Sequence, residues 1–314
     1  MNTGVKITAF AAAAAVTFTA AYGVGAAADP IRQDPHPATR HAAHNGMSAG
    51  HGDGHADATP AGLQISQAGY TLDLKTPRVT AGEKSELRFA IRDQQRRQVT
   101  SYRREHDKEL HLILASRDLI TYRHLHPTRA TNGTWSTPVT LPNAGSYRVL
   151  ADFTPAAEGA PGITLGADLA ASGTYQAPAM PKPTAATTVD GYTVTFDGKL
   201  TPGSAAEITL SVSRNGHPIT DLQPYLGAYG HLVALRSGDL AYLHVHPNGE
   251  PGDGTTKPGP GIAFTATAPS AGTYRLFLDF KHHGTVHTAA FTVQTDKTAA
   301  PKTADTQEHG DHKH

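Results

Sequence analysis

Short runs of alternating hydrophobic and polar residues cover most of the chain, and Gly, Pro and Asn separate one run from the next. Residues 69–74 (GYTLDL) and 191–196 (GYTVTF) are typical runs. Alternation with a period of two places successive side chains on opposite faces of a β-strand. Two segments each carry about seven such runs, a spacing typical of a β-sandwich. The pattern therefore predicts an all-β protein.

The runs of the first segment recur in the same order in the second. The matching pairs are residues 79–93 with 200–214, 110–127 with 230–247, and 141–153 with 268–280. Matches that keep their order over this length indicate a duplicated unit. We expect two tandem domains of about 110 residues, each large enough to bury a core of its own.

A tyrosine follows a glycine turn at the same place in both units. Tyr147 ends the sequence NAGSY, and Tyr274 ends the sequence SAGTY. This is the layout of a tyrosine corner, in which the hydroxyl bonds back to the preceding loop of an immunoglobulin-like sandwich. The predicted fold is therefore two tandem immunoglobulin-like β-sandwich domains.

The ends of the chain differ in composition from these two units. Lys6, an Ala-rich apolar run and a small-residue pattern ending at Ala28 indicate an export signal or a membrane anchor. The chain is thus expected to be secreted, or anchored to the outer face of the cytoplasmic membrane. The expected organisation is a signal peptide or anchor at 1–28, a disordered His-rich segment at 29–61, repeat 1 at 62–177, a linker at 178–186, repeat 2 at 187–295, and a disordered His-rich tail at 296–314.

The composition limits which metal ligands the chain can offer. The chain has 19 histidines and no cysteine, which excludes disulfides, thiol catalysis and a blue-copper centre. Imidazole and carboxylate remain as ligands, and they suit Cu(II), Zn(II) or Ni(II). The 27 Lys and Arg residues balance the 27 Asp and Glu residues. The balanced charge therefore gives no indication of nucleic-acid binding. Contact with a membrane is expected only through the N-terminal anchor.

The hexapeptide YLHVHP, residues 242–247, places two histidines on the second strand of a predicted hairpin. With a tight turn at residues 237–238, His231 faces His244, and His246 shares their face because side chains alternate. A turn shifted by one residue pairs His231 with His246 and still leaves all three on one face. The hairpin thus predicts a cluster of imidazoles.

A second His-rich turn, KHHGTVH at residues 281–287, is expected at the same rim because the strand before it runs antiparallel to the first hairpin strand. The predicted metal ligands of repeat 2 are His231, His244, His246 and His287, with His283 as a substitute for His287. Repeat 1 has the hairpin motif as YRHLHP but lacks this turn. Its predicted ligands are His111, His124 and His126, with Asp168 and His106 as nearby candidates.

Three other interpretations of the histidines stay open. They form structural hydrogen bonds at a core edge or between domains; they hold a catalytic metal with an open position; or the tandem domains are a non-catalytic interaction module. The sequence contains no nucleophile elbow, phosphate loop or recognisable carboxylate pair. Facing histidines in both units favour metal binding, because burying imidazoles without partners costs about 1–3 kcal/mol each.

Residues 111–127 (HLILASRDLITYRHLHP) and 225–247 (YLGAYGHLVALRSGDLAYLHVHP) resemble repeats of secreted bacterial proteins grouped with copper and heavy-metal handling. The domains are similar in kind to the YtkA-like and CopC-like classes. The resemblance covers about residues 63–293 and implies an extracytoplasmic, metal-associated sandwich without a defined reaction. The N-terminal histidine on which CopC-type copper sites rely is absent, so that site geometry is not carried over.

The sequence as a whole predicts a non-enzymatic protein that captures Cu(II), or alternatively Zn(II), outside the cell. Its expected partners are metal ions and metal-handling proteins at the cell surface. The metal affinity is expected to fall below about pH 6.5, because protons compete for imidazole nitrogens.

Overall fold

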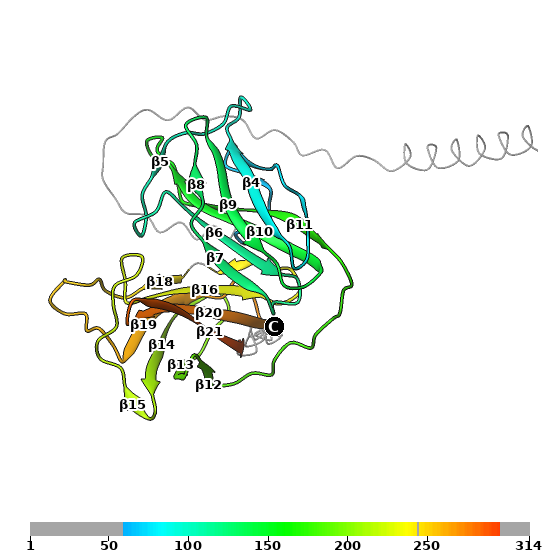
Figure 1. The fold of residues 1–314 in the computed structure, drawn as a ribbon. Coiled ribbons are helices and arrows are strands. Elements are labelled where there is room, and N and C mark those ends of the chain that lie inside the picture. The colour runs from blue at the N-terminus through cyan, green and yellow to red at the C-terminus, as the bar shows by residue number, and fades with distance from the viewer. Residues whose placement is uncertain (1–58, 244, 296–314) are drawn as a thin grey trace, which may run out of the picture. The chain divides into compact units, whose positions relative to one another are not determined.

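The structure is a computed structural model that describes residues 59–243 and 245–295 (Figure 1). All strands and sheets in these residues belong to two tandem sandwiches, which confirms the predicted all-β, immunoglobulin-like fold class. The predicted signal peptide or anchor and the His-rich tail lie outside the described residues. Within the described part, no helix has the length and apolar character needed to cross a membrane.

Repeat 1 consists of two sheets that enclose one hydrophobic core. The first sheet has the order β1 (Ser66–Gln67), β2 (Tyr70–Leu74), β4 (Lys84–Arg92), β9 (Thr134–Thr140) and β8 (Thr128–Arg129). The second has the order β3 (Arg78–Thr80), β11 (Ile163–Ser172), β10 (Gly145–Pro155), β6 (Leu110–Ser116) and β7 (Tyr122–Leu125), with β5 (Tyr102–Arg103) paired to β10.

Repeat 2 has the same plan. One sheet has the order β12 (Ala186–Val189), β13 (Tyr192–Gly198), β14 (Ala205–Arg214), β19 (Gly261–Thr267) and β18 (Val245–Pro247), with β15 (His217–Pro218) paired to β14. The other has the order β17 (Tyr242–Leu243), β16 (Gly230–Arg236), β20 (Thr273–His282) and β21 (Thr285–Gln294). A core of its own lies between these sheets.

Both predicted tyrosine corners form. Tyr147 donates its hydroxyl hydrogen bond to the Asn143 carbonyl at 2.7 Å, and Tyr274 donates to the Ser270 carbonyl at 2.7 Å. Both rings are fully buried. Each bond satisfies a hydroxyl that would otherwise be costly to bury and fixes the loop that leads into β10 or β20.

A third hydrophobic cluster lies between the two repeats rather than inside either one. Corresponding positions of the repeats supply it, and the pairs are Ile113 with Val233, Tyr122 with Tyr242, and Leu150 with Phe277. The Tyr122 and Phe277 rings stack with centroids 4.0 Å apart. The sheet with β6 and β10 therefore packs against the sheet with β16 and β20 through equivalent faces, and side chains on those faces meet.

The registers of the two hairpins differ from the first expectation. In repeat 2, Leu235 pairs with Tyr242, which is the register of the shifted turn. In repeat 1, Ile113 rather than His111 pairs with His124. The turns are longer than two residues and contain a leucine in the left-handed region, with φ of 59° at Leu119 and 61° at Leu240. A shift by two residues leaves each side chain on its expected face.

The second hairpin strand of repeat 2 does not stay paired with β16 as far as His246. Its β17 residues pair with β16, whereas the following strand β18 pairs with β19 in the opposite sheet. His246 is accordingly paired with Thr265 and not with His231. The expected pairing of these two histidines is wrong.

The start of repeat 1 also reaches across to repeat 2. Ala61, which the sequence assigned to the disordered segment, accepts a hydrogen bond from the Tyr242 backbone at 2.9 Å. The next residue, Gly62, donates to the Thr164 carbonyl at 2.9 Å. These contacts tie a segment just before repeat 1 to both repeats, so ordered structure begins before residue 62.

Candidate metal centre

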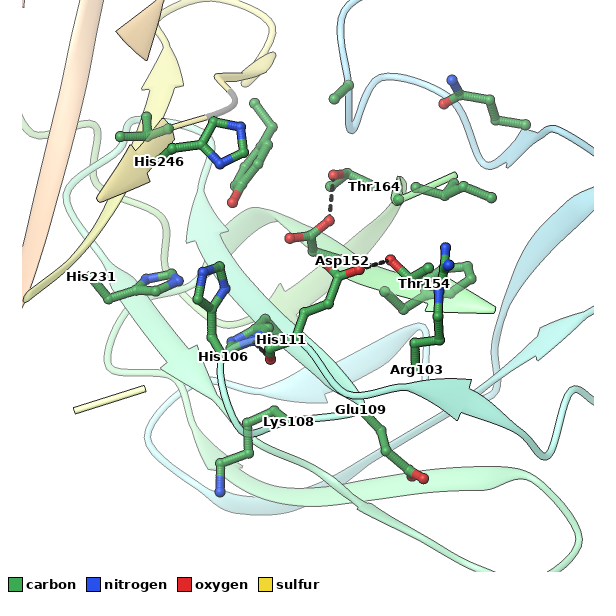
Figure 2. A pocket seen from close by; sticks show the side chains of 18 residues that line it. Arg103, His106, Lys108, Glu109, His111, Asp152, Thr154, Thr164, His231 and His246 are labelled. Atoms are coloured by element: carbon green, nitrogen blue, oxygen red, sulfur yellow. Dashed lines mark hydrogen bonds between the residues drawn. The ribbon is translucent and has the colours of Figure 1, made fainter. Parts of the chain in front are cut away.

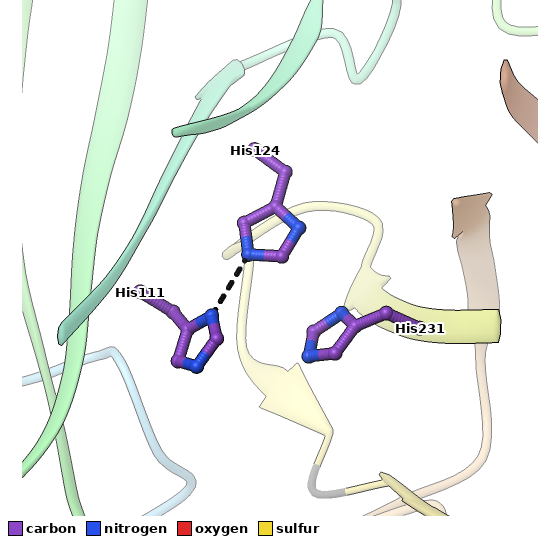
Figure 3. Close-up of side chains that lie close together, drawn as sticks. All are labelled: His111, His124 and His231. Carbon is purple, nitrogen blue, oxygen red and sulfur yellow. Dashed lines mark hydrogen bonds between the residues drawn. The ribbon is translucent and has the colours of Figure 1, made fainter. Parts of the chain in front are cut away.

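Three histidines from both repeats meet at the inter-repeat interface, and we call them the inter-repeat triad: His111 from β6, His124 from β7 and His231 from β16 (Figure 3). One ring nitrogen of each lies within 4.8 Å of those of the others. The ring of His231 stacks on that of His111, with centroids 5.4 Å apart and planes 14° apart. His111 and His231 hold equivalent positions in the two repeats, so the packing of equivalent faces brings them together.

The outer nitrogens of two of these rings are held by groups that can only accept hydrogen bonds. His124 Nδ1 lies 2.9 Å from Asp279 Oδ2, and their side chains are only 2% and 3% exposed. His111 Nε2 lies 3.1 Å from the backbone carbonyl oxygen of Glu105. A carboxylate or carbonyl oxygen needs a donor, so these outer nitrogens carry the ring protons.

The inner nitrogens of the same two rings then carry lone pairs. His111 Nδ1 and His124 Nε2 point at each other across 3.1 Å. Two neutral rings with these tautomers have no proton to share at that contact. The pair needs one additional positive charge between the rings, either a proton or a metal ion.

Burial opposes an additional proton on the His111 ring. Desolvation, reinforced by the nearby His124, lowers the pKa of His111 to about 4. Burial among neighbouring imidazoles likewise lowers the pKa of His231 well below its usual value. At neutral pH these two rings are therefore neutral, which is the form that binds a metal.

Two more histidines border the triad. The ring of His126 lies 4.8 Å from that of His124, and burial lowers the pKa of His126 to about 3. The exposed His106 lies 5.8 Å from the His231 ring, measured between centroids. Among the described residues, His126 Nε2 and His231 Nδ1 are buried nitrogens without a hydrogen-bond partner. Such nitrogens are unusual in a folded protein.

The predicted repeat 1 ligands, His111, His124 and His126, thus lie together. His231 joins them across the interface instead of forming a second cluster at the rim of repeat 2. His244 lies outside the described residues. His246 is exposed on β18 and lines a cavity beside the triad. The expectation of one separate histidine cluster in each sandwich is therefore wrong for His231.

His283 and His287 do not join the triad. His287 pairs with Phe280, which faces the core of repeat 2, whereas His231 pairs with the preceding residue, Asp279. Because successive strand residues point to opposite faces, His287 and His231 diverge. His283 is exposed and packs on the His282 ring, with centroids 3.9 Å apart. The turn lies at the end of the sheet where β16 begins, as predicted, but the prediction that these histidines converge with His231 on one site is wrong.

We call His282, His283 and His287 the repeat 2 histidine group. His282 Nδ1 lies 2.7 Å from the Tyr192 hydroxyl, and its Nε2 lies 3.0 Å from Asp221. His287 Nδ1 lies 2.7 Å from Asp190. Hydroxyl and carboxylate partners satisfy these nitrogens, as expected of structural histidines.

Asp279 is the functional candidate that the sequence did not single out. It is almost fully buried, bonds to His124 and accepts a hydrogen bond from Thr288 at 2.6 Å. The signal was present as the aligned aspartates of YRVLADF and YRLFLDF, Asp152 and Asp279. Asp168, suggested as a ligand in repeat 1, instead pairs with Arg148 at 2.8 Å and is 73% exposed. That suggestion is wrong.

The chain matches one protein-family model twice. Residues 65–173 and 187–297 each match the family described as "Domain of unknown function (DUF8832)". The two matches correspond to the two sandwiches. No curated protein matches the sequence.

Several solved structures are similar in part. The adhesin FdeC of Escherichia coli is 18% identical with a TM-score of 0.23, covering 73% of this chain and 65% of its own. A protein from Corynebacterium diphtheriae described as membrane-anchored is 10% identical with a TM-score of 0.22, covering 73% and 57%. Invasin, a bacterial integrin-binding protein, is 14% identical with a TM-score of 0.22, covering 73% and 40%. This chain spans less than two thirds of these three proteins, and such low scores carry no conclusion about activity.

Proposed function

We propose that this chain, which belongs to the DUF8832 family, binds one divalent transition metal ion between its two repeats through His111, His124 and His231. Cu(II) is the favoured ion and Zn(II) the alternative. The site takes the place of the two separate rim sites expected from the sequence. The setting we propose is extracytoplasmic, with the protein secreted or held at the outer face of the membrane.

The observation that carries this proposal is the contact between His111 Nδ1 and His124 Nε2 at 3.1 Å. Both outer nitrogens are committed to oxygen acceptors, so both inner nitrogens present lone pairs. A cation bound to both converts this unfavourable contact into two ligand bonds. At metal–nitrogen bonds of about 2.0–2.1 Å, the separation corresponds to an angle of about 100° at the metal, which suits tetrahedral or tetragonal sites.

His231 supplies the third nitrogen. Ligands at about 2.0–2.1 Å from one ion can be no more than about 4.2 Å apart. One ring nitrogen of each residue lies within 4.8 Å of those of the others, so the most distant pair must approach by at least about 0.6 Å for both nitrogens to reach one ion.

The contacts behind the ligands support the same function. Asp279 and the Glu105 carbonyl fix the orientation and tautomer of two ligand rings, as acceptors behind metal-bound histidines do. Neutral imidazoles without any thiolate favour Cu(II) over other divalent ions by the Irving–Williams order. The resemblance of the HLHP and HVHP segments to copper-associated repeats supports this choice.

A shared site also suggests a use for the duplication. Repeat 1 supplies His111 and His124, and repeat 2 supplies His231. Metal capture would then stabilise the packing of the two repeats by linkage. Metal-handling proteins at the cell surface are the partners we propose for loading or unloading the ion.

The test is a Cu(II) and Zn(II) titration of the full-length chain in competition with a chelator, which discounts weak binding by the His-rich ends. We expect one tight site per chain. His124→Ala should lower its affinity by more than the roughly 10–100-fold that loss of an outer partner costs. The control is His217→Ala, an exposed histidine on β15. Equal affinities in wild type and His124→Ala would reject the site and leave the tandem domains as an interaction module.

A further inference from the structure

A cavity of about 180 Å³ opens beside the inter-repeat triad (Figure 2). His111 and His231 form part of its wall, with His106 and His246 at the same side. This volume is smaller than the roughly 300–1,000 Å³ of pockets for drug-sized ligands. It offers room for a small molecule next to two of the proposed ligands.

Asp152 lines the same cavity. It lies on β10 directly across from His111 on β6, so the two side chains project from one face of the sheet. Its Oδ1 accepts a hydrogen bond from the Thr164 hydroxyl at 2.9 Å, and Thr164 also lines the cavity. The carboxyl group of Asp152 and the ring of His111 therefore line the same cavity.

Asp152 and Asp279 are equivalent residues of the two repeats with different surroundings. Asp279 bonds to His124 and Thr288 and is almost fully buried. Asp152 bonds to Thr164, and its carboxyl group faces the cavity (Figure 2). One aspartate of the pair thus orients a ligand ring, while the other is placed to contact a molecule that enters the cavity.

We propose that the cavity admits a small neutral ligand to an open fourth position on the metal, and that Asp152 accepts a hydrogen bond from this ligand. The inference rests on the proposed metal site. The chemical class is a molecule of a few heavy atoms with one donor atom for the metal and one N–H or O–H group for Asp152. Three protein ligands and an exchangeable fourth position distinguish such a centre from a closed structural site.

Imidazole and 1-methylimidazole are suitable probes because both offer a metal-binding nitrogen, but only imidazole keeps an N–H. 4-Methylimidazole controls for size, since it carries both a methyl group and an N–H. The full-length chain is loaded with half an equivalent of Cu(II) at about pH 8, where the carboxyl is ionised. Each probe is then titrated, and the visible and electron paramagnetic resonance spectra of the copper are followed.

We expect imidazole and 4-methylimidazole to bind at least about tenfold more tightly than 1-methylimidazole, because a hydrogen bond to a carboxylate is charge-assisted. In copper-loaded Asp152→Ala the advantage of the N–H probes should disappear. The wild-type comparison needs no variant and therefore does not depend on how Asp152→Ala folds.

Each other result has a distinct meaning. Copper that binds tightly but responds to none of the probes would overturn the open position and leave the metal site standing. Equal affinities for imidazole and 1-methylimidazole in wild type would overturn the role of Asp152. Failure to bind Cu(II) at all would instead reject the proposed function.

Discussion

The inter-repeat triad and the repeat 2 histidine group have the same residue type and opposite hydrogen-bond chemistry. In the repeat 2 group, His282 and His287 contact a tyrosine hydroxyl and two carboxylates. In the triad, His111 and His124 direct lone pairs at one another. The difference teaches that a count of nearby histidines does not identify a metal site. A metal site is identified by the hydrogen-bond partner of each ring nitrogen.

The two groups also differ in which repeat supplies them. Among the described residues, the repeat 2 group bonds to Tyr192, Asp190 and Asp221 of its own repeat. The triad draws on both repeats, and its orienting carboxylate, Asp279, comes from the repeat opposite His124. Substitutions in the two groups should therefore separate metal affinity from stability.

The largest expected effect is that substitution of His231 changes the Cu(II) affinity, whereas substitution of His282 changes the stability. His231→Ala should lower Cu(II) affinity by more than about 100-fold, because a ligand is lost. His282→Ala should leave that affinity unchanged but lower the free energy of unfolding by about 1–3 kcal/mol, because the buried Tyr192 hydroxyl loses its 2.7 Å contact with His282. Chelator competition and urea unfolding of the metal-free protein measure the two quantities. Equal metal affinities in the two variants would break the comparison.

The orienting carboxylates give the next effect. Asp279→Asn should reduce Cu(II) affinity about 10–100-fold, because an amide lacks the negative charge that holds the proton on His124 Nδ1. The matched variant Asp190→Asn removes the carboxylate beside His287 and should leave the metal affinity at the wild-type value. A similar loss in both variants would point to a general change in folding, which circular dichroism would detect.

The metal-free protein should lose stability on acidification. Burial lowers the pKa of His111 to about 4 and that of His126 to about 3, whereas an unfolded histidine titrates near 6.5. Below about pH 6.5 the unfolded chain binds more protons, so the free energy of unfolding falls as the pH drops toward about 4. Each such histidine contributes at most about 1.4 kcal/mol per pH unit.

Unfolding of His126→Phe between about pH 7.5 and about pH 4.5 checks this origin. The variant should show a shallower loss of stability, whereas the exposed control His217→Ala should follow wild type. An unchanged slope in His126→Phe would mean that buried histidines do not govern the pH dependence. The sequence predicted that protons compete with the metal below about pH 6.5. Because the pKa of His111 is lowered, protons should compete for this ring only at a lower pH.

The smallest effect on the tight site should come from the ends of the chain. Deleting residues 29–58 and 296–314 removes several histidines and should lower the total number of bound Cu(II) ions. The affinity of the tightest site should not change, because its ligands come from the strands. Loss of the tight site in this truncated chain, seen by competition with a chelator, would contradict that assignment.

The fold could be predicted from the sequence because its signals are local. Alternation defines strands, and the NAGSY and SAGTY segments define the tyrosine corners. The face shared by His111 and His124 followed from period-two alternation, even though the register was shifted by two residues. Register depends on turn conformation, and the left-handed leucines at 119 and 240 carry no strong sequence signal.

The composite site could not be predicted in the same way because it depends on how the repeats pack. Nothing in the alternation of residues 230–236 says which face of β16 meets a second domain. The hydrophobic residues Val233 and Leu235 were compatible with a core face, and they in fact line the inter-repeat cluster. The pairing of His124 with Asp279, 155 positions apart in the chain, is a consequence of that packing.

Pulsed electron paramagnetic resonance that counts the imidazoles bound to Cu(II) tests the central claim most directly, with full-length protein loaded below one equivalent. The account predicts three imidazoles in the wild type and two in each of His111→Ala and His231→Ala, which remove one ligand from each repeat. An unchanged count in His231→Ala would mean that repeat 2 contributes no ligand and would contradict a metal ion held between the repeats.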